Sequence, residues 1–244
     1  VLIDALKRLV SVPIIVGGPH ASLLPESFPD SVDHVVMGEG EKALIELVEG
    51  RLKNRIIHGD RFSSLELEEL SWPDYHDFHD KPYNWKLDIF NLKQKRVFSM
   101  NTSRGCPFYC NFCGVARVSG RGYRVFSAGK IVNEIQRLKE KFDIDGIYFR
   151  EDNFTALRKR LREFCSLLIK KKLGLIWASE SRVDAADKEL LKLMYDSGCR
   201  GLYIGVESGS QKVLDSMNKG VKVEQVIKFF EDCQDTGIKT YATF

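Results

Sequence analysis

The chain has 244 residues, of which 43% are hydrophobic, so it is long enough to bury a sizeable core. Its formal net charge of only +3 argues against a nucleic-acid partner, and the basic runs 158–160 and 170–172 fit solvated helix faces better than a binding patch. No apolar run approaches the ~20 residues that a membrane-spanning helix needs. These features predict a cytoplasmic protein in a reducing compartment.

The first fifty residues alternate between helical and strand patterns. We expect a helix over 1–10, strands over 13–16 and 32–37, and a helix over 41–49. The first strand ends at Gly17 and Gly18, where paired glycines allow positive φ and close approach of a ligand to the backbone. An ordinary strand-to-loop turn is the alternative for this pair. The alternation indicates the end of a parallel α/β sheet whose ligand edge lies at the carboxyl ends of its strands.

Periodicity is lost between residues 51 and 96, where the chain is aromatic and polar, so this segment reads as a linker. It contains four side chains that resemble a metal site, namely His76, Asp77, His79 and Asp80. Because Pro73 and Pro82 bracket them closely, we interpret them as part of the linker and not as metal ligands.

Three cysteines follow a strand predicted over 97–101. Cys106, Cys110 and Cys113 have the spacing CxxxCxxC, and one short loop can therefore bring three thiolates to three corners of a four-iron four-sulfur cluster. The fourth iron is then open to a small molecule, which favours a catalytic cluster. A structural zinc site usually has a fourth ligand close by, and none is present here. Three neighbouring cysteines also cannot all pair in disulfides.

The remainder of the chain alternates strands with helices, which predicts a parallel sheet with helices outside it. Expected strands cover 146–149, 174–178, 201–206 and 239–244, and expected helices cover 128–142, 158–172, 186–197, 211–217 and 223–236. Cys165, Cys199 and Cys233 recur every 34 residues in apolar surroundings, about one strand-plus-helix unit. We interpret them as buried core thiols and not as ligands of a second cluster.

Polar residues stand at the ends of these strands, where a parallel barrel collects its functional side chains. Helix capping is the alternative explanation, and it suits Asn153 and Ser208. It suits the charged residues less well, because several carboxylates on one edge would repel one another without cationic partners. The charged candidates are Glu151, Asp152, Glu180, Arg182 and Glu207.

The run Arg104-Gly105-Cys106-Pro107 with Tyr109-Cys110 and Phe112-Cys113 resembles the signature of radical S-adenosylmethionine (radical SAM) enzymes that carry a cobalamin-binding domain before the radical core. The resemblance extends from about Gly17 to Phe244. It implies that the open iron binds S-adenosylmethionine and that the reduced cluster cleaves it to a 5′-deoxyadenosyl radical. It also implies a partial parallel (β/α)6 barrel, of which this chain would end at the fifth strand.

The same resemblance implies roles for individual residues. Glu151 and Asp152 match the acidic motif that meets the methionine ammonium, and Glu207 matches a motif near the ribose and methionine. Ser181 and Arg182 match the strand end that meets the ribose and carboxylate, and Phe112 matches the aromatic residue whose backbone lies by adenine.

The segment from residue 14 to residue 41 resembles the closing third of a Rossmann-like cobalamin-binding domain, in which Gly17 and Gly18 match the glycine pair along the cobalamin tail. His20 is expected to be a loop residue and not a cobalt ligand. The implied organisation is the C-terminal part of the cobalamin-binding domain over 1–60, a linker over 61–96 and a truncated radical SAM core over 97–244.

The sequence thus predicts a radical SAM enzyme with a 4Fe-4S cluster, S-adenosylmethionine and, in the parent protein, cobalamin. Methyl transfer is the expected outcome, or a related radical modification, with an external electron donor and a small-molecule or peptide substrate. An iron-sulfur electron-transfer or scaffold module is one alternative, although an electron carrier needs no acidic edge for an ammonium. A radical tRNA-modifying enzyme is another, and the lack of a strong basic patch counts against it.

Overall fold

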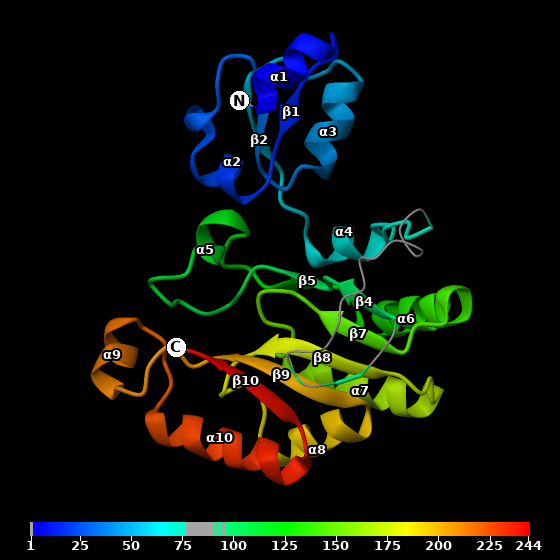
Figure 1. Ribbon diagram of the computed structural model, residues 1–244, viewed down its shortest axis with the longest axis vertical. Helices are drawn as coiled ribbons and strands as arrows, with labels where there is room; N and C mark the ends of the chain where they lie inside the picture. The colour runs from blue at the N-terminus through cyan, green and yellow to red at the C-terminus, as the bar shows by residue number, and fades with distance from the viewer. Residues whose placement is uncertain (1, 77–89, 91, 94–95) are drawn as a thin grey trace. The chain divides into compact units, whose positions relative to one another are not determined.

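The computed structural model describes residues 2–76, 90, 92, 93 and 96–244 (Figure 1). Three residues of the segment considered above as a metal site, Asp77, His79 and Asp80, lie outside the described residues. The chain divides into two compact units. The N-terminal unit comprises Val1–Ser63 with Gly114–Arg121, and the C-terminal unit comprises Ser64–Cys113 with Gly122–Phe244.

The N-terminal unit contains a parallel sheet of three strands in the order β1-β2-β3. Its elements are α1 (Leu2–Leu9), β1 (Ile15–Val16), α2 (Pro19–Leu23), a 3-10 turn (Pro25–Ser27), β2 (His34–Gly38), α3 (Glu41–Val48), β3 (Ile56–Gly59) and α5 (Val115–Val118). The predicted helix, strand, strand and helix are all present. Helix α5 packs on α2.

Two expectations for this part of the chain are corrected. His20 lies in the first turn of α2 and not in a loop, because Pro19 begins the helix, and its Nε2 lies 2.8 Å from Ser27 Oγ. The segment expected to lack regular structure contains β3 and, in the C-terminal unit, α4 (Ser64–Glu69). Only Ile56 and Ile57 of the four residues of β3 are apolar, which is too little to indicate a strand, and pairing with β2 stabilises it.

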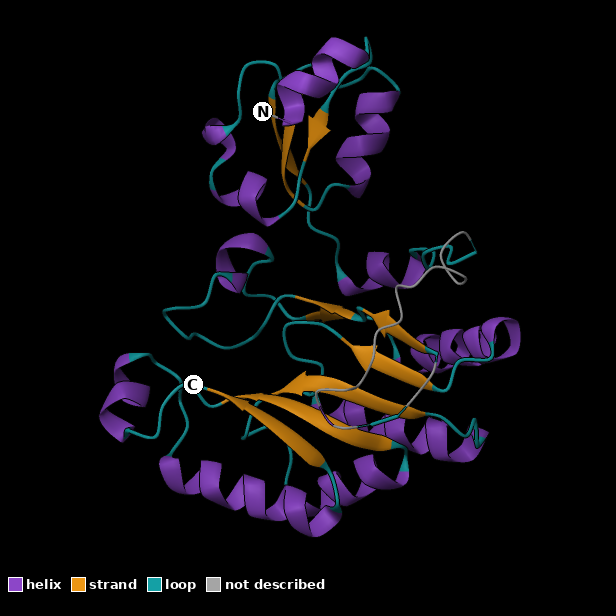
Figure 2. Ribbon diagram, in the orientation of Figure 1, coloured by secondary structure: helices purple, strands orange, loops and turns teal. Residues whose placement is uncertain are grey.

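The C-terminal unit is built on five parallel strands in the order β10-β9-β8-β7-β4. The strands are β4 (Val97–Met100), β7 (Gly146–Phe149), β8 (Ile176–Ser181), β9 (Cys199–Gly205) and β10 (Lys239–Thr243). The helices are α6 (Ala128–Phe142), α7 (Arg158–Lys171), α8 (Lys188–Asp196), α9 (Gln211–Ser216) and α10 (Val223–Thr236). Figure 2 shows α6, α7, α8 and α10 along one side of the sheet. The predicted parallel α/β alternation is confirmed.

Strand alternation separates two buried clusters, one on each face of the sheet. Ile147 and Phe149 belong to the large cluster under the helices, whereas Tyr148 lies in a smaller cluster with Phe90 and Ala178. In a strand, successive side chains point to opposite faces. The face away from the helices therefore carries its own packed layer of side chains.

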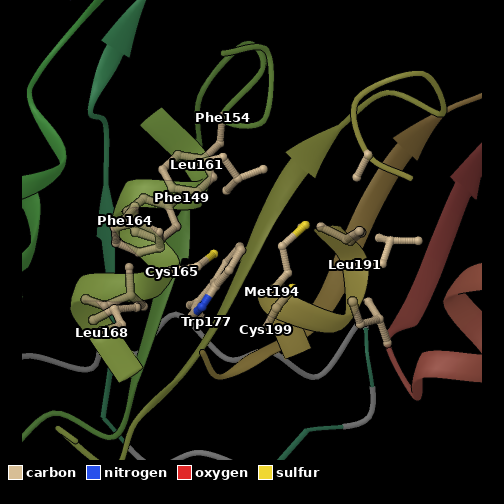
Figure 3. Close-up of a cluster of buried hydrophobic side chains, with 14 of the residues drawn as sticks. Phe149, Phe154, Leu161, Phe164, Cys165, Leu168, Trp177, Leu191, Met194 and Cys199 are labelled. Carbon is tan, nitrogen blue, oxygen red and sulfur yellow. The ribbon is translucent and has the colours of Figure 1, made fainter. Parts of the chain in front are cut away.

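Aromatic rings dominate the large cluster. Phe149, Phe154, Phe164 and Trp177 are almost fully buried, and their rings contact one another at centroid distances of 4.0–5.9 Å (Figure 3). These rings join β7, β8 and α7 at one point, and their burial contributes strongly to stability.

The three cysteines spaced at 34 residues are buried in the core as free thiols, which confirms their interpretation as core residues. The pKa of the Cys199 thiol is raised by burial, as expected for an inert core thiol. Among the described residues, no helix combines the length and the apolarity needed to cross a bilayer.

We expect Phe149→Ala to lower the free energy of unfolding by about 3–5 kcal/mol, because the cavity lies among three other rings that cannot all close in on it. Phe244→Ala is the matched control: the Phe244 side chain is 82% exposed, so its removal should change the free energy by less than about 0.5 kcal/mol. Urea unfolding followed by far-UV circular dichroism measures both. Equal effects of the two substitutions would contradict the packing described here.

Candidate functional site

The carboxyl ends of the five parallel strands lie at one edge of the C-terminal unit's sheet, here called the C-terminal edge. Beyond β4 the chain forms a two-stranded antiparallel ribbon, in which β5 (Ser103–Arg104) pairs with β6 (Arg124–Val125). The cysteine loop, residues 105–113, begins directly after β5. Its first residue, Gly105, has φ +81°, a value that favours glycine and lets the chain turn sharply. The loop is therefore delivered to the C-terminal edge.

The cysteine loop is held by the residues that follow α9. The backbone N–H of Asn111 donates to Met217 O at 3.0 Å, and its side-chain Nδ2 donates to Ser216 O at 2.7 Å. Asn218 Nδ2 in turn donates to Tyr109 O at 2.9 Å. These bonds span more than one hundred residues of sequence, so the loop conformation depends on the tertiary fold.

Asn111 and Asn218 did not emerge from the sequence as site residues. The sequence does hold a signal for Asn218, which stands before Lys219-Gly220 after a helix. Asn tolerates the left-handed conformation better than most residues, and Asn218 has φ +52° in the structure. The sequence held no comparable signal for Asn111.

The cysteines themselves are free thiols, each half-buried. Across the described ranges, no three His, Cys, Asp or Glu side chains converge as they would around a single metal ion. A four-iron cluster does not require ligands that converge on a single ion. Each thiolate binds a separate iron, so the three sulfurs need not share one centre. Burial raises the pKa of the Cys106 thiol, and Arg182 opposes that shift. The donor set of three thiols beside a cation fits an iron-sulfur cluster.

Arg182, immediately after β8, places a cation beside one of these thiols. Its side chain is 8% exposed and lies with its guanidinium carbon 3.8 Å from the centre of the Phe108 ring. Nη1 lies 3.5 Å from Cys110 Sγ, and Nη2 donates to Lys219 O at 2.7 Å. A two-bond ion pair with Asp184 holds the same guanidinium.

Glu207 follows β9 and pairs with Lys219, whose Nζ lies 3.1 Å from Glu207 Oε1. Glu207 has φ +71°, an uncommon conformation for a residue with a side chain. A Cβ at Gly205 would lie 2.6 Å from Glu207 Oε1, so a larger residue at that position would force the Glu207 carboxylate to move. Lys219 Nζ also lies 5.9 Å from the centre of the Phe112 ring, which is exposed. The pair therefore lies close to the end of the cysteine loop.

Glu151 and Asp152 follow β7 but have different surroundings. Glu151 is buried and accepts hydrogen bonds from the backbone and hydroxyl of Thr102, at 3.2 and 2.7 Å, and from the hydroxyl of Ser103. Burial raises its pKa to about 7, against the opposing charge of Arg160. Asp152 is exposed and accepts from the backbone N–H of Gly105. Of these two carboxylates, Asp152 is the one open to a ligand.

Glu180 and Ser181 lie within β8, which extends three residues further than the sequence predicted, so strand alternation sends them to opposite faces. Glu180 accepts from Tyr148 Oη at 2.9 Å on the face away from the helices. Ser181 is buried, with its Oγ 2.6 Å from Thr155 Oγ1. These bonds give the Glu180 and Ser181 side chains partners, whereas the buried Ser179 Oγ has no hydrogen-bond partner among the described residues.

Each carboxylate expected at the C-terminal edge thus has a described partner within the protein. Glu207 has Lys219, Glu180 has Tyr148, Asp152 has the backbone N–H of Gly105, and Glu151 has the hydroxyls of Thr102 and Ser103. The mutual repulsion of carboxylates that the sequence predicts is relieved by partners within the protein. No external cation is needed to explain why these carboxylates lie at one edge.

The glycine pair of the N-terminal unit lies at the carboxyl end of β1. Gly18 has φ +95°, and a Cβ built there would have open space around it. Ser22 links this loop to the end of the next strand: its Oγ donates to Gly18 O and accepts from Gly38 N, both at 2.9 Å. The carboxyl ends of β1 and β2 therefore lie side by side, and Gly17 and Gly18 are exposed there, which fits the approach of a large flat ligand.

The comparison with known proteins agrees with this geometry. The family described as the Radical SAM superfamily matches residues 100–244. An uncharacterized methyltransferase of Pyrococcus horikoshii is 28% identical over 96% of this chain and 54% of its own length. The anaerobic magnesium-protoporphyrin IX monomethyl ester cyclase of Rubrivivax gelatinosus is 30% identical over 94% of this chain and 45% of its own length. The chain therefore spans about half the length of these curated relatives.

Among solved structures, the radical S-adenosylmethionine methyltransferase TsrM from Kitasatospora setae, with cobalamin and a [4Fe-4S] cluster bound, superposes with a TM-score of 0.75. The two chains are 18% identical, and the match covers 99% of this chain and 52% of that one. At this level of identity the likeness concerns the fold.

We expect Asn218→Gly to reduce iron incorporation into the cysteine loop while leaving the fold intact. Glycine accepts the positive φ, so only the hydrogen bond to Tyr109 O is lost, which contributes about 1 kcal/mol to the ordered loop. Iron per chain after anaerobic reconstitution measures the effect, and a circular dichroism spectrum checks the fold. Iron content equal to that of the wild type would show that this bond does not order the loop.

The raised pKa of Glu151 makes a pH-dependent contribution to stability. The folded protein binds the Glu151 proton more tightly than the unfolded chain does. The contribution of Glu151 to the free energy of unfolding is therefore greatest below about pH 4.5 and is lost as the pH rises through about 7. At about 1.4 kcal/mol per pKa unit the loss is on the order of 3 kcal/mol.

Glu151→Gln removes this titration, so the stability of the wild type relative to the variant should fall between about pH 5 and about pH 8. Urea unfolding of the cluster-free proteins at the two pH values measures it. A difference that does not change with pH would mean that Glu151 titrates normally in the folded protein.

Proposed function

Because the chain belongs to the radical SAM superfamily, we propose that Cys106, Cys110 and Cys113 hold a 4Fe-4S cluster. At this cluster the parent protein cleaves S-adenosylmethionine, and the cleavage serves cobalamin-dependent methyl transfer or a related modification. The observation that carries this proposal is the anchoring of the cysteine loop at the C-terminal edge by the residues after α9. In parallel α/β sheets this edge is where ligands bind. When bound, the cluster supplies the electron that splits S-adenosylmethionine into methionine and a 5′-deoxyadenosyl radical.

The protein's own residues would bind and orient S-adenosylmethionine, which carries an ammonium, a carboxylate and an adenine. Asp152 is suited to the ammonium, because it is exposed and held by the backbone of Gly105 next to the first cysteine. The Glu207–Lys219 pair offers both a carboxylate and an ammonium beside Phe112, which suits the ribose and methionine end. The exposed Phe112 is suited to adenine.

The remaining predicted contacts have partners within the protein. Glu151 and Ser181 are buried behind the edge, so they support the neighbouring loops in this proposal. Arg182 would reach the carboxylate of S-adenosylmethionine only through Nη1, since Nε and Nη2 already bond Asp184 and Lys219.

Cobalamin enters the proposal through the N-terminal unit. Gly17, Gly18 and Gly38 line the exposed carboxyl ends of its strands, where a flat ligand could approach the backbone. The structurally similar methyltransferase was solved with cobalamin and a cluster bound, and curated relatives are named as a methyltransferase and a cyclase. Since these proteins are about twice as long, the substrate, a small molecule or a peptide, and its chemistry belong to the longer protein.

The proposed reaction also needs partners and conditions. Each cleavage consumes one electron, so an external electron donor is required. Three half-buried free thiols stay available to iron in a reducing compartment, which supports the cytoplasm as the proposed location.

We expect anaerobic reconstitution to load about four irons per chain and to give, after reduction, an electron paramagnetic resonance signal that shifts when S-adenosylmethionine is added. Cys110→Ala should lose the signal, because the cluster then lacks one of its three ligands. Cys165→Ala is the matched control: this thiol is buried in the core, so iron loading should be unchanged.

A signal that ignores S-adenosylmethionine would favour the electron-transfer module. Zinc in place of iron would overturn both interpretations.

A further inference from the structure

Arg182 is placed to act on the cysteine loop itself. Its guanidinium stacks on the ring of Phe108, inside the loop, and its Nη1 lies 3.5 Å from Cys110 Sγ. For a hydrogen bond to sulfur this is an ordinary length. We propose that Arg182 is a positioning residue that donates a hydrogen bond to the sulfur of Cys110 and thereby raises the reduction potential of the cluster. The inference rests on the cluster site proposed above.

The guanidinium is held rigidly in this position. Nε and Nη2 donate to the two oxygens of Asp184 at 2.9 and 2.8 Å, and Nη2 also donates to Lys219 O at 2.7 Å. Together with the contact to Cys110, four of the five N–H groups of Arg182 have described acceptors. A side chain held by four hydrogen bonds loses little further conformational entropy when the cluster binds. Its Nη1 donor is therefore already oriented toward the Cys110 sulfur.

Burial makes this hydrogen bond effective. The Arg182 side chain is 8% exposed, and its partner Asp184 compensates the charge at Nε and Nη2, away from the Nη1 that faces Cys110. The pair therefore presents a dipole whose positive end faces Cys110. Polar groups act more strongly on a neighbouring charge in such a water-poor environment than at an exposed surface.

The direction of the effect follows from the charge of the cluster. Reduction adds one electron, and the thiolate sulfurs carry part of the added negative charge. A hydrogen bond to such a sulfur stabilises the reduced form more than the oxidised form, and hydrogen bonds to the sulfurs are among the factors that determine cluster potentials. Removing the Arg182 donor should therefore make the potential more negative.

This role differs from the contact with S-adenosylmethionine expected from the sequence. A residue that binds only the substrate would leave the potential of the substrate-free cluster unchanged and weaken the shift caused by S-adenosylmethionine. A residue that donates to Cys110 changes the potential before S-adenosylmethionine is present. A redox titration without S-adenosylmethionine separates the two roles.

The test compares Arg182→Met and Arg182→Gln with Arg182→Lys, which keeps the cation. The matched control is Arg158→Met: Arg158 also donates to a backbone oxygen and a carboxylate, Ala185 O at 2.9 Å and Asp187 at 3.1 Å, and no contact with a loop cysteine is described for it. Each protein is reconstituted anaerobically, its iron per chain is measured, and its midpoint potential is determined by redox titration followed by electron paramagnetic resonance.

We expect Arg182→Met and Arg182→Gln to retain iron and to shift the midpoint potential to more negative values, Arg182→Lys to recover part of the shift, and Arg158→Met to match the wild type. An unchanged potential in either neutral variant with full iron content overturns the proposal. Loss of iron from both neutral variants also overturns it, since Arg182 would then be needed for cluster assembly itself. A wild type that takes up no cluster would instead refute the proposed function.

Discussion

Parallel pairing of the five main strands is the constraint on which the candidate site depends. Because β4, β7, β8, β9 and β10 all run in one direction, their carboxyl ends meet at one edge, and residues far apart in sequence become neighbours there. The cysteine loop follows β4, the last strand of the sheet, yet its partners include Asp152 after β7, Arg182 after β8 and Asn218 after α9. No local interaction could bring these segments together. The helices on one side of the sheet and the aromatic core beneath them maintain this arrangement.

Internal charge compensation is the second organising feature. The edge carries several acidic side chains. Glu151, Glu180 and Glu207 each have a partner from a different segment of the C-terminal unit, whereas Asp184 pairs with Arg182, two residues before it. Such pairs cost desolvation energy, so they are weak evidence of stability on their own. They do fix the orientation of loops that must be ordered before a cofactor binds. Arg182 and Lys219 each pair with an acidic side chain and also help to order a loop. The two residues are linked directly, because Nη2 of Arg182 donates to the backbone oxygen of Lys219.

Much of the fold could be predicted from the sequence because the C-terminal unit follows simple periodic rules. Helices α6 and α10 and strand β7 have the predicted bounds, since their apolar positions repeat clearly and their ends carry recognisable signals. The sequence predicts no strand at β3, because only Ile56 and Ile57 of its four residues are apolar, and it predicts that β8 ends at residue 178, because polar residues follow. In both cases pairing with a neighbouring strand outweighs local preference.

The sequence by itself determined the chemistry that is available: three thiols at CxxxCxxC spacing, acidic and basic residues at strand ends, and a glycine pair after a short strand. Only the tertiary structure decided which of these side chains are open and which are occupied. Glu151 and Asp152 are adjacent in sequence, yet one is buried among hydroxyls and the other is exposed. The contact of Arg182 with Cys110 joins residues 72 positions apart. Packing and strand order bring such residues together, and neither can be read from the spacing of residues along the chain.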